Sequence, residues 1–277
     1  MTNHGNMYGP DFTFLGIERC DLEKLETYKD ADVVIVGAPI DSGTSHRSGA
    51  KFGPQAIRMG DYLPHDGERP HLALRTDGLK DMKVVDAGDL LMNGGNLEES
   101  LALLAAATEK ISRAGAIAVI LGGDHSIASA DVAGIANHRG KGKISMVHFD
   151  AHADTGADQW GALVGHGTPM RRLIENGHVR GDRFLQLGLR GYWPDDATLN
   201  WMRDQGMRSY EMTEIHHRGL KTVLDESFSI LTDGCDGVFL SVDIDVVDPG
   251  MAPGTGTPEP GGMTSRELLE AVRRICL

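Results

Sequence analysis

Short apolar runs rich in β-branched residues recur along this chain, and they constrain its fold more than any other feature. Runs of this length and composition are typical of strands that are buried on both faces of a sheet. Each run is therefore predicted to form a strand. They lie at residues 32–39, 83–88, 116–123, 144–150, 183–190 and 237–245.

A helical pattern lies between the second and third of these runs. It reads LEESLALLAAATEKISRAG, with Asn96 as the predicted N-cap, Glu99 in the first turn and Gly115 as the C-terminal stop. Strands that alternate with helices are joined by right-handed crossovers and run parallel. The sequence therefore predicts a doubly wound, mostly parallel α/β sheet with helices on both faces, and such sheets bind ligands beyond the carboxyl ends of their strands.

The composition suits one soluble domain. A chain of 277 residues with 40% hydrophobic content can bury a sizeable core, and no linker or repeat divides it, so a single domain over residues 1–277 is expected. A formal charge of −13 would repel nucleic acid and anionic membranes but would attract a small cation. The start has neither the charged region nor the apolar core of a signal peptide, which favours a cytoplasmic location.

The cysteines do not predict a disulfide framework or a zinc site. Cys20, Cys235 and Cys276 are widely spaced and form no CxxC pair. We expect them to be buried or inert thiols.

Three of the apolar runs end in acidic and imidazole groups instead of ordinary turn residues. The motifs are GGDHS, MVHFDAHAD and FLSVDID. Alternate residues of an extended chain point to the same side, and neighbouring parallel strands end at the same edge of a sheet. If the three strands are neighbours, six side chains converge there. They are His125, Asp150, His152, Asp154, Asp243 and Asp245.

Such a cluster predicts a pair of metal ions. Four unpaired carboxylates would repel one another, and burial would cost roughly several kcal/mol per ion. A shell of oxygen and nitrogen without thiolate suits Mn2+ better than structural zinc, with Ni2+ or Co2+ as alternatives. Six ligands are too many for one ion with an open position, but they suffice for two ions about 3.5 to 4 Å apart with Asp150 and Asp243 bridging. We therefore expect two Mn2+ ions per chain.

Each motif has a plainer interpretation when taken alone. A DxHxD or DxD pattern often marks the solvent-facing side of a strand, and Asp124 of GGDHS could simply cap the next helix. The occurrence of all three motifs at the ends of apolar strands favours the metal site.

GGDHS, HFDAHAD and SVDIDVVDP, in this order and with these separations, resemble the ureohydrolases, the family of arginase, agmatinase and guanidino-acid hydrolases. The resemblance covers nearly the whole chain. It implies the doubly wound α/β fold, a pair of Mn2+ ions and a homo-oligomer, either a trimer or a hexamer. One ion would take His125, Asp150, Asp154 and Asp243, and the other would take Asp150, His152, Asp243 and Asp245.

Two further segments look like the agmatinase branch of this family. They are residues 37–58 and the HGTPM motif that begins at His166. The resemblance implies that His166 moves protons to the leaving amine and that Thr257 lies near the guanidinium. His46 and Ser48 stand where the branch commonly has tyrosine and proline, so the loop around them departs from the pattern.

Two arginines of the first of these segments are expected to have structural roles. Arg47 and Arg58 would repel a cationic substrate, so we expect them to pair with carboxylates.

The expected activity is hydrolysis of a guanidino compound, agmatine first, to urea and a primary amine. A hydroxide bridging the two ions would attack the guanidinium carbon, Asp154 would help to stabilise the tetrahedral intermediate, and His166 would protonate the amine. The alternatives are a formimino-glutamate hydrolase and a non-catalytic metal-binding subunit. A deacetylase with one zinc would leave His125 and Asp245 without a role.

The carboxyl end departs most from the resembled family. Thr264 and Glu267 predict a capping box at the start of a final helix, which ends the chain at Leu277. In that family the helix leads to one more central strand, whose end carries a glutamate that binds the guanidinium. We therefore expect the natural protein to continue by at least a strand and a helix. The alternatives are a partner chain that supplies the strand, or a damaged protein.

Overall fold

The structure is a computed structural model that describes residues 6–60 and 68–277. The chain folds as two compact units, and each is described by itself. The first unit contains the described residues of Met1–Gly43 and Ser48–His138, and the second contains Thr44–Arg47 and Arg139–Leu277. The single domain expected over residues 1–277 remains a prediction.

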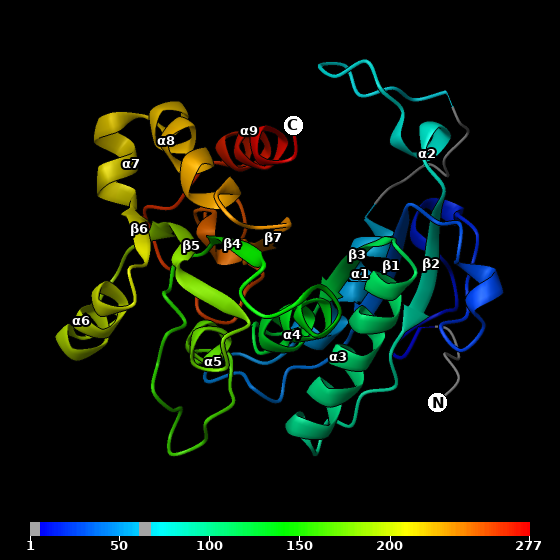
Figure 1. Ribbon diagram of the computed structural model, residues 1–277, viewed down its shortest axis with the longest axis horizontal. Helices are drawn as coiled ribbons and strands as arrows, with labels where there is room; N and C mark the ends of the chain where they lie inside the picture. Colours follow the sequence, from blue (N-terminus) through cyan, green and yellow to red (C-terminus); the bar gives the residue numbers. More distant parts are fainter. Residues whose placement is uncertain (1–5, 61–67) are drawn as a thin grey trace. The chain divides into compact units, whose positions relative to one another are not determined.

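The first unit is built on a parallel three-stranded sheet with the order β2-β1-β3 (Figure 1). Its strands are β1 (Val33–Ala38), β2 (Val84–Asp89) and β3 (Ile117–Gly122). Its helices are η1 (Phe14–Gly16), η2 (Leu25–Thr27), η3 (Ala50–Phe52), α1 (Gly53–Met59), α2 (Gly78–Asp81), α3 (Leu97–Arg113) and α4 (Ile127–Arg139).

Helix α3 covers one face of this sheet. Its residues Ala107 and Ile111 pack in one apolar cluster with alternate residues of the strands, including Val34 and Val36 of β1. The predicted caps are confirmed: the Asn96 side chain accepts a hydrogen bond from the Glu99 amide at 3.1 Å, and Gly115, just past the helix, has a φ of 88°.

A buried ion cluster joins helix α1 to strand β2. The Arg58 guanidinium donates to both carboxylate oxygens of Asp86, each at 2.9 Å, and also to Asp89. The backbone amides of Met7 and Phe14 donate to Asp89 and Asp86 at 2.9 and 2.8 Å. The structural role predicted for Arg58 is therefore confirmed.

The same prediction for Arg47 is wrong. Its side chain is exposed and forms no ion pair with any described residue.

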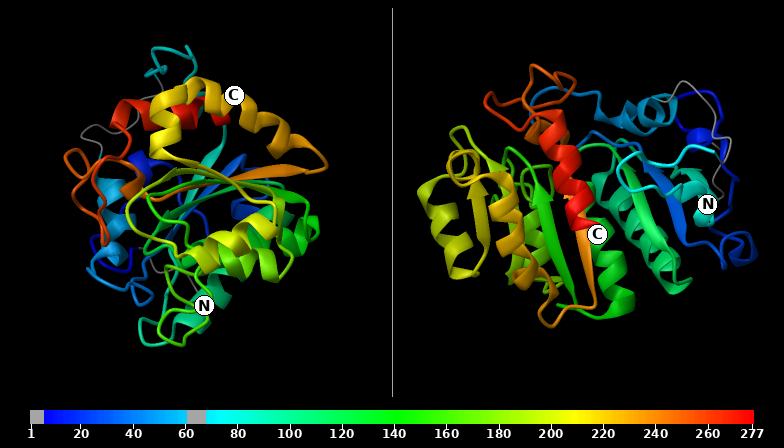
Figure 2. Two further views of the ribbon diagram at one scale, coloured as in Figure 1. Left: turned by 90° about the vertical axis from the view of Figure 1, so that its left-hand side faces the viewer. Right: turned by 90° about the horizontal axis from the view of Figure 1, so that it is seen from above.

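The second unit is built on a parallel four-stranded sheet with the order β6-β5-β4-β7. Helices α7, α8 and α9 lie on one face of this sheet, and α5 and α6 lie on the other (Figure 2). The strands are β4 (Ile144–Phe149), β5 (Val179–Leu189), β6 (Arg208–Glu211) and β7 (Gly237–Val242). The helices are α5 (Pro169–Glu175), α6 (Asp196–Asp204), α7 (Met212–Arg218), α8 (Leu220–Thr232), η4 (Ile244–Val246) and α9 (Ser265–Ile275).

Side-chain alternation gives the central strands of this sheet two different faces. Val147 and Phe149 of β4 pack with Leu185 and Leu187 of β5 against helices α7, α8 and α9. His148, between the two β4 residues, points to the opposite face. The predicted parallel α/β layers are therefore present, and the predicted capping box of α9 forms between Thr264 and Glu267.

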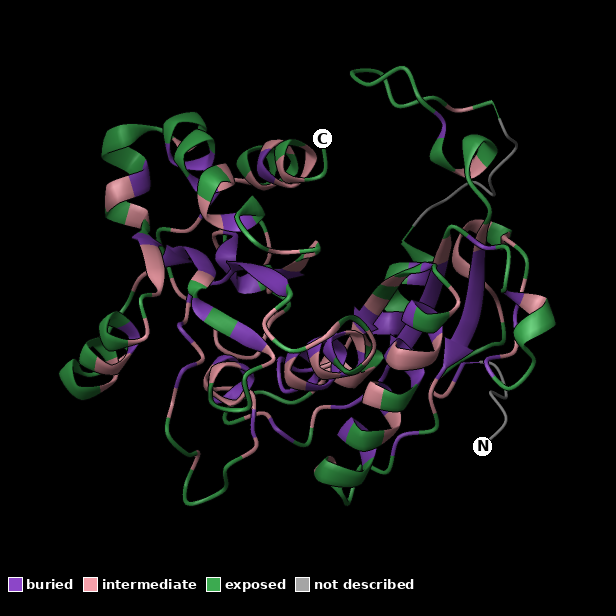
Figure 3. Ribbon diagram, viewed as in Figure 1, coloured by how far each residue is buried: buried purple, intermediate pink, exposed green. Residues whose placement is uncertain are grey.

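Burial of the strands on both faces is confirmed for some strands only. Strands β1, β2 and β4 are buried over most of their length (Figure 3). In contrast, Ile117 of β3 is 62% exposed and Val238 of β7 is 45% exposed. The reason is that, within the described residues, β3 pairs only with β1 and β7 pairs only with β4, so each is an edge strand. The strand expected beyond Leu277 remains a prediction.

Candidate metal centre

The candidate ligands of the second unit follow the carboxyl ends of two paired strands. Asp150 comes directly after β4, and Asp243 comes directly after β7. The Asp243 amide donates to the Phe149 carbonyl at 2.9 Å, and this bond holds the carboxyl ends of β4 and β7 side by side. Because β4 and β7 are parallel neighbours, the residues after both strands meet at one edge of the sheet.

The chain after β4 is not extended, so the alternation predicted for this motif is wrong. Residues 151 and 152 lie in a bend, and Asp154 has a φ of 51°. The Asp154 carbonyl accepts a hydrogen bond from Met170 in α5 at 3.1 Å. The turn still gathers the side chains: ligand atoms of His148, Asp150 and Asp154 lie within 4.8 Å of one another.

A second group of ligand atoms joins the two strand ends. Atoms of Asp150, His152 and Asp245 lie within 4.8 Å of one another. His152 Nδ1 is 3.1 Å from Asp245 Oδ2 and 3.5 Å from Asp150 Oδ1. Both carboxylates are buried and the imidazole is half-buried. Two carboxylates and an imidazole in this arrangement can hold a divalent cation.

Asp245 lies in the short helix η4, not in the strand predicted to reach it. Strand β7 ends at Val242, and the Asp243 side chain caps η4 by accepting a hydrogen bond from the Asp245 amide at 3.0 Å. Asp245 Oδ1 in turn accepts from the Ala151 amide at 3.0 Å. Among the described residues, Asp243 joins neither group of ligand atoms, so its bridging role remains a prediction.

The electrostatics of the group favour a bound cation. Burial raises the pKa of Asp245, and the negative charges of Asp150 and Asp243 raise it further. Burial lowers the pKa of His152, but hydrogen bonds and charge from Asp150 and Asp245 outweigh this effect and raise it to about 11. Buried carboxylates that repel one another beside an imidazole form a donor set of oxygen and nitrogen that fits Mn2+ and similar divalent ions.

His125 belongs to the first unit. It is buried in the turn between β3 and α4, where its carbonyl accepts a hydrogen bond from Ala128. The neighbouring Asp124 side chain accepts from the Ser126 amide at 2.9 Å and from the Gly43 amide at 2.8 Å. Both amides lie outside α4 (Ile127–Arg139), so the capping role of Asp124 remains a prediction, as does the share of His125 in the metal site.

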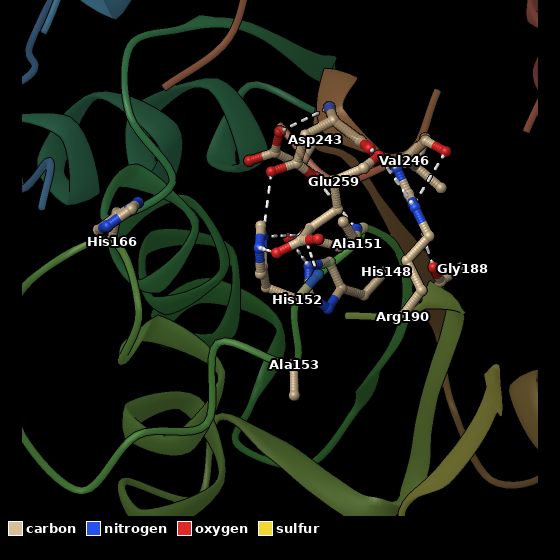
Figure 4. A network of polar contacts seen from close by, with 12 residues as sticks. His148, Ala151, His152, Ala153, His166, Gly188, Arg190, Asp243, Val246 and Glu259 are labelled. Carbon is tan, nitrogen blue, oxygen red and sulfur yellow. Dashed lines mark hydrogen bonds and ion pairs between the residues drawn. The ribbon is translucent and has the colours of Figure 1, made fainter. Parts of the chain in front are cut away.

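His166 lies apart from the ligand groups of the second unit, as Figure 4 shows. The Ser45 amide donates to His166 Nε2 at 3.1 Å, and Ser45 Oγ is 2.6 Å from the same nitrogen. Since Nε2 accepts from a backbone amide, the neutral ring carries its proton on Nδ1. This placement leaves the proton-transfer role of His166 a prediction.

Thr257 is half-buried in the loop between η4 and α9. The adjacent Gly256 lies against residues 44–47: a Cβ at Gly256 would be 3.0 Å from the Arg47 carbonyl oxygen. These residues include Ser45, which holds His166. Residues 44–47, the part of the agmatinase-like segment 37–58 that belongs to the second unit, therefore lie beside both His166 and the loop that carries Thr257.

Arg190 and Glu259 were not predicted from the sequence. The Arg190 guanidinium donates to the carbonyls of Asp245 at 2.6 Å and Glu259 at 2.7 Å, and also to those of Gly188 and Val246 (Figure 4). Glu259 Oε1 is 3.9 Å from His152 Nε2. The only sequence signal was the position of Arg190 at the end of an apolar run.

Comparisons with known proteins agree with this geometry. The chain is 38% identical to the guanidinobutyrase of Pseudomonas aeruginosa over 87% of this chain and 74% of that one. It is 37% identical to the mitochondrial agmatinase of Gallus gallus, over 92% and 74% of the two chains. The solved structure of proclavaminate amidino hydrolase from Streptomyces clavuligerus superposes with a TM-score of 0.83 at 33% identity, covering 97% of this chain and 85% of that one. The arginase-family pattern matches residues 31–277, and the chain belongs to the arginase family.

Proposed function

We propose that this protein hydrolyses a guanidino compound to urea and a primary amine. The observation that carries the proposal is the buried group of Asp150, His152 and Asp245 in a chain of the arginase family. In the reaction, the oxygen of one water forms the new bond to the guanidinium carbon. The bond from that carbon to the substituted nitrogen breaks, and the amine leaves as an ammonium ion.

Two divalent ions, Mn2+ first, would be held by the six predicted ligands. When bound, they lower the pKa of a water, so that hydroxide is available near neutral pH. Asp150 and Asp245 would offset part of the charge of the ions, and the Ala151 and His152 amides hold these two carboxylates in place. The ligand set is His125, Asp150, His152, Asp154, Asp243 and Asp245.

The remaining residues would bind the substrate and move a proton. His166, whose Nε2 accepts from the Ser45 amide, would relay a proton from water to the departing amine. Thr257, beside residues 44–47, would contact the guanidinium. A net charge of −13 attracts the cationic guanidinium at long range. The proposal also includes a cytoplasmic location and a homo-oligomer, a trimer or a hexamer, as the resemblance implies.

Agmatine is the first candidate substrate. The agmatinase-like loop at residues 44–47 and the similarity to a chicken agmatinase support it. The similarity to a guanidinobutyrase makes guanidinobutyrate the next compound to assay. Arginine is expected to be a poor substrate.

Urea release from the purified, Mn2+-loaded chain tests the proposal. The panel is agmatine, guanidinobutyrate, guanidinopropionate, arginine and formimino-glutamate, and a chelator-treated sample is the control. Urea from the first three compounds is expected. Formamide without urea would favour a formimino-glutamate hydrolase, and a clear preference for arginine would contradict the assigned branch. Metal binding without any turnover would favour a non-catalytic subunit.

A further inference from the structure

A row of polar side chains crosses the buried sheet of the second unit. His148 of β4 stands opposite Gln186 of β5, which stands opposite Ser209 of β6. Both His148 and Gln186 are completely buried. Buried polar groups are costly unless they are hydrogen-bonded, so a row of them in the middle of a sheet calls for an explanation.

Hydrogen bonds connect this row to a candidate metal ligand. Ser209 Oγ donates to Gln186 Oε1 at 3.1 Å, and Gln186 Nε2 is 3.0 Å from His148 Nδ1. His148 Nε2 lies 2.7 Å from Asp150 Oδ2. The chain of bonds therefore runs from strand β6 to Asp150, and all of it lies within the second unit.

The partners fix which atom of each side chain donates. Gln186 Nε2 also contacts the Ala153 carbonyl oxygen at 2.7 Å, and a carbonyl can only accept. Nε2 is therefore the donating end of the amide, and His148 Nδ1 must accept from it. The proton of the neutral imidazole then lies on Nε2, which donates to Asp150.

These bonds leave the Asp150 carboxylate oriented and still able to bind cations. Oδ1 accepts from the His152 amide at 2.7 Å, and Oδ2 accepts from His148. Ligand atoms of Asp150 belong to both groups of candidate metal ligands, so this orientation is compatible with a bound cation. Through Ala153, Gln186 also holds the turn that carries His152 and Asp154.

We propose that His148, fixed by Gln186 and Ser209, is a positioning residue that orients Asp150 toward two metal ions and is not itself a ligand. The proposal rests on the metal site of the proposed function. His148 is near enough to Asp150 and Asp154 to be considered as a ligand. To bind an ion through Nε2, however, His148 would have to carry its proton on Nδ1. That N–H would then point at the N–H group that Gln186 donates, so two donors would oppose each other.

The test is titration of Mn2+ into the chelator-treated full chain by calorimetry. His148→Phe keeps a ring in place but removes the donor, and loss of such a partner typically weakens metal affinity by about 10- to 100-fold. His148→Gln, whose amide replaces the Nε2 donor, is expected to recover most of this loss. Gln186→Met, which frees the ring, should give a smaller loss. The number of ions per chain should stay at the wild-type value in all three.

Ser145→Ala is the matched control. Ser145 is buried on the same strand, but it donates to the Gly237 carbonyl at 3.3 Å. Because it lies three residues before His148, its side chain points to the opposite face of the sheet. Its Mn2+ affinity should equal that of the wild type. The thermal midpoint of each metal-free variant is measured alongside, so that a loss of affinity is separated from a loss of folded protein.

Each contrary result has a distinct meaning. Loss of one ion in His148→Phe would make His148 a ligand and overturn the proposal. Unchanged affinity in His148→Phe and Gln186→Met would show that the row serves stability alone. If His148→Phe does not fold, Gln186→Met, which keeps the imidazole, decides the matter. A wild-type chain that binds no Mn2+ would overturn both this proposal and the proposed function, whereas wild-type binding with unaffected variants would overturn only this one.

Discussion

Replacing Arg190 by alanine should loosen the loop that carries Thr257 and Glu259. The guanidinium holds this loop to η4 through its two shortest bonds, to the carbonyls of Asp245 and Glu259. Each hydrogen bond to a charged group contributes about 1.5–3 kcal/mol. Because water can reach part of this site, we expect a total loss near the lower end, about 3 kcal/mol. For a chain of this size, that corresponds to a fall of about 6–12 °C in the thermal midpoint.

Thermal unfolding followed by circular dichroism, together with urea-release kinetics, measures the effect. Arg190→Lys keeps the charge but lacks the planar guanidinium. Its thermal midpoint should therefore lie between those of the wild type and Arg190→Ala. Arg203→Ala is the control. Arg203 is exposed on α6, and its side chain bonds only to Asn200 Oδ1 among the described residues, so this variant should change stability by less than about 0.5 kcal/mol. We also expect KM to rise in Arg190→Ala, because the loop beside residues 44–47 is no longer fixed. A midpoint shift as small as that of Arg203→Ala, with an unchanged KM, would refute the reasoning.

Three further predictions concern other residues. His166→Ala should keep the metal content and lower kcat by about 10²- to 10⁴-fold, the range for loss of a general acid; loss of a metal ion would contradict the assignment. Metal analysis of the Mn2+-loaded chain should find two ions, and Asp243→Ala should abolish urea release and lower the thermal midpoint; a single ion in the wild type would count against the pair. Burial and the charge of Asp86 raise the pKa of Cys20 to about 12, so iodoacetamide at pH 8 should label the exposed Cys276 first; equal labelling rates by mass spectrometry would show that Cys20 is not protected.

The strands of the central sheets were predictable because their apolar runs are long and uninterrupted. The run at 144–150 became β4, Ile144–Phe149, and the run at 116–123 became β3, Ile117–Gly122. Strand β6 was missed because its four residues, RSYE, contain only one apolar side chain. The exposure of β3 and β7 was also missed, since the order of strands in a sheet depends on contacts between distant segments.

The candidate site was predicted in its residues more than in its geometry. The sequence placed Asp150, His152 and Asp245 at strand ends, and they do come together. Their convergence depends on a bend and a short helix, where the Asp243 and Asp245 carboxylates accept hydrogen bonds from the backbone amides of Asp245 and Ala151. Arg190 could not be assigned, since its partners are backbone carbonyl oxygens, which every residue type supplies.

The ion cluster at Arg58 limits how far the chain can be truncated from its N-terminus without loss of stability. The arginase-family pattern begins at residue 31, yet the amides of Met7 and Phe14 complete the hydrogen bonding of Asp89 and Asp86. A shortened chain that started at residue 31 would keep every predicted metal ligand. It would nevertheless leave two buried carboxylates without these donors, at about 1–3 kcal/mol each. Residues 7 and 14, which precede the family pattern, thus help to stabilise the first unit, and a truncation guided by family similarity alone would remove them.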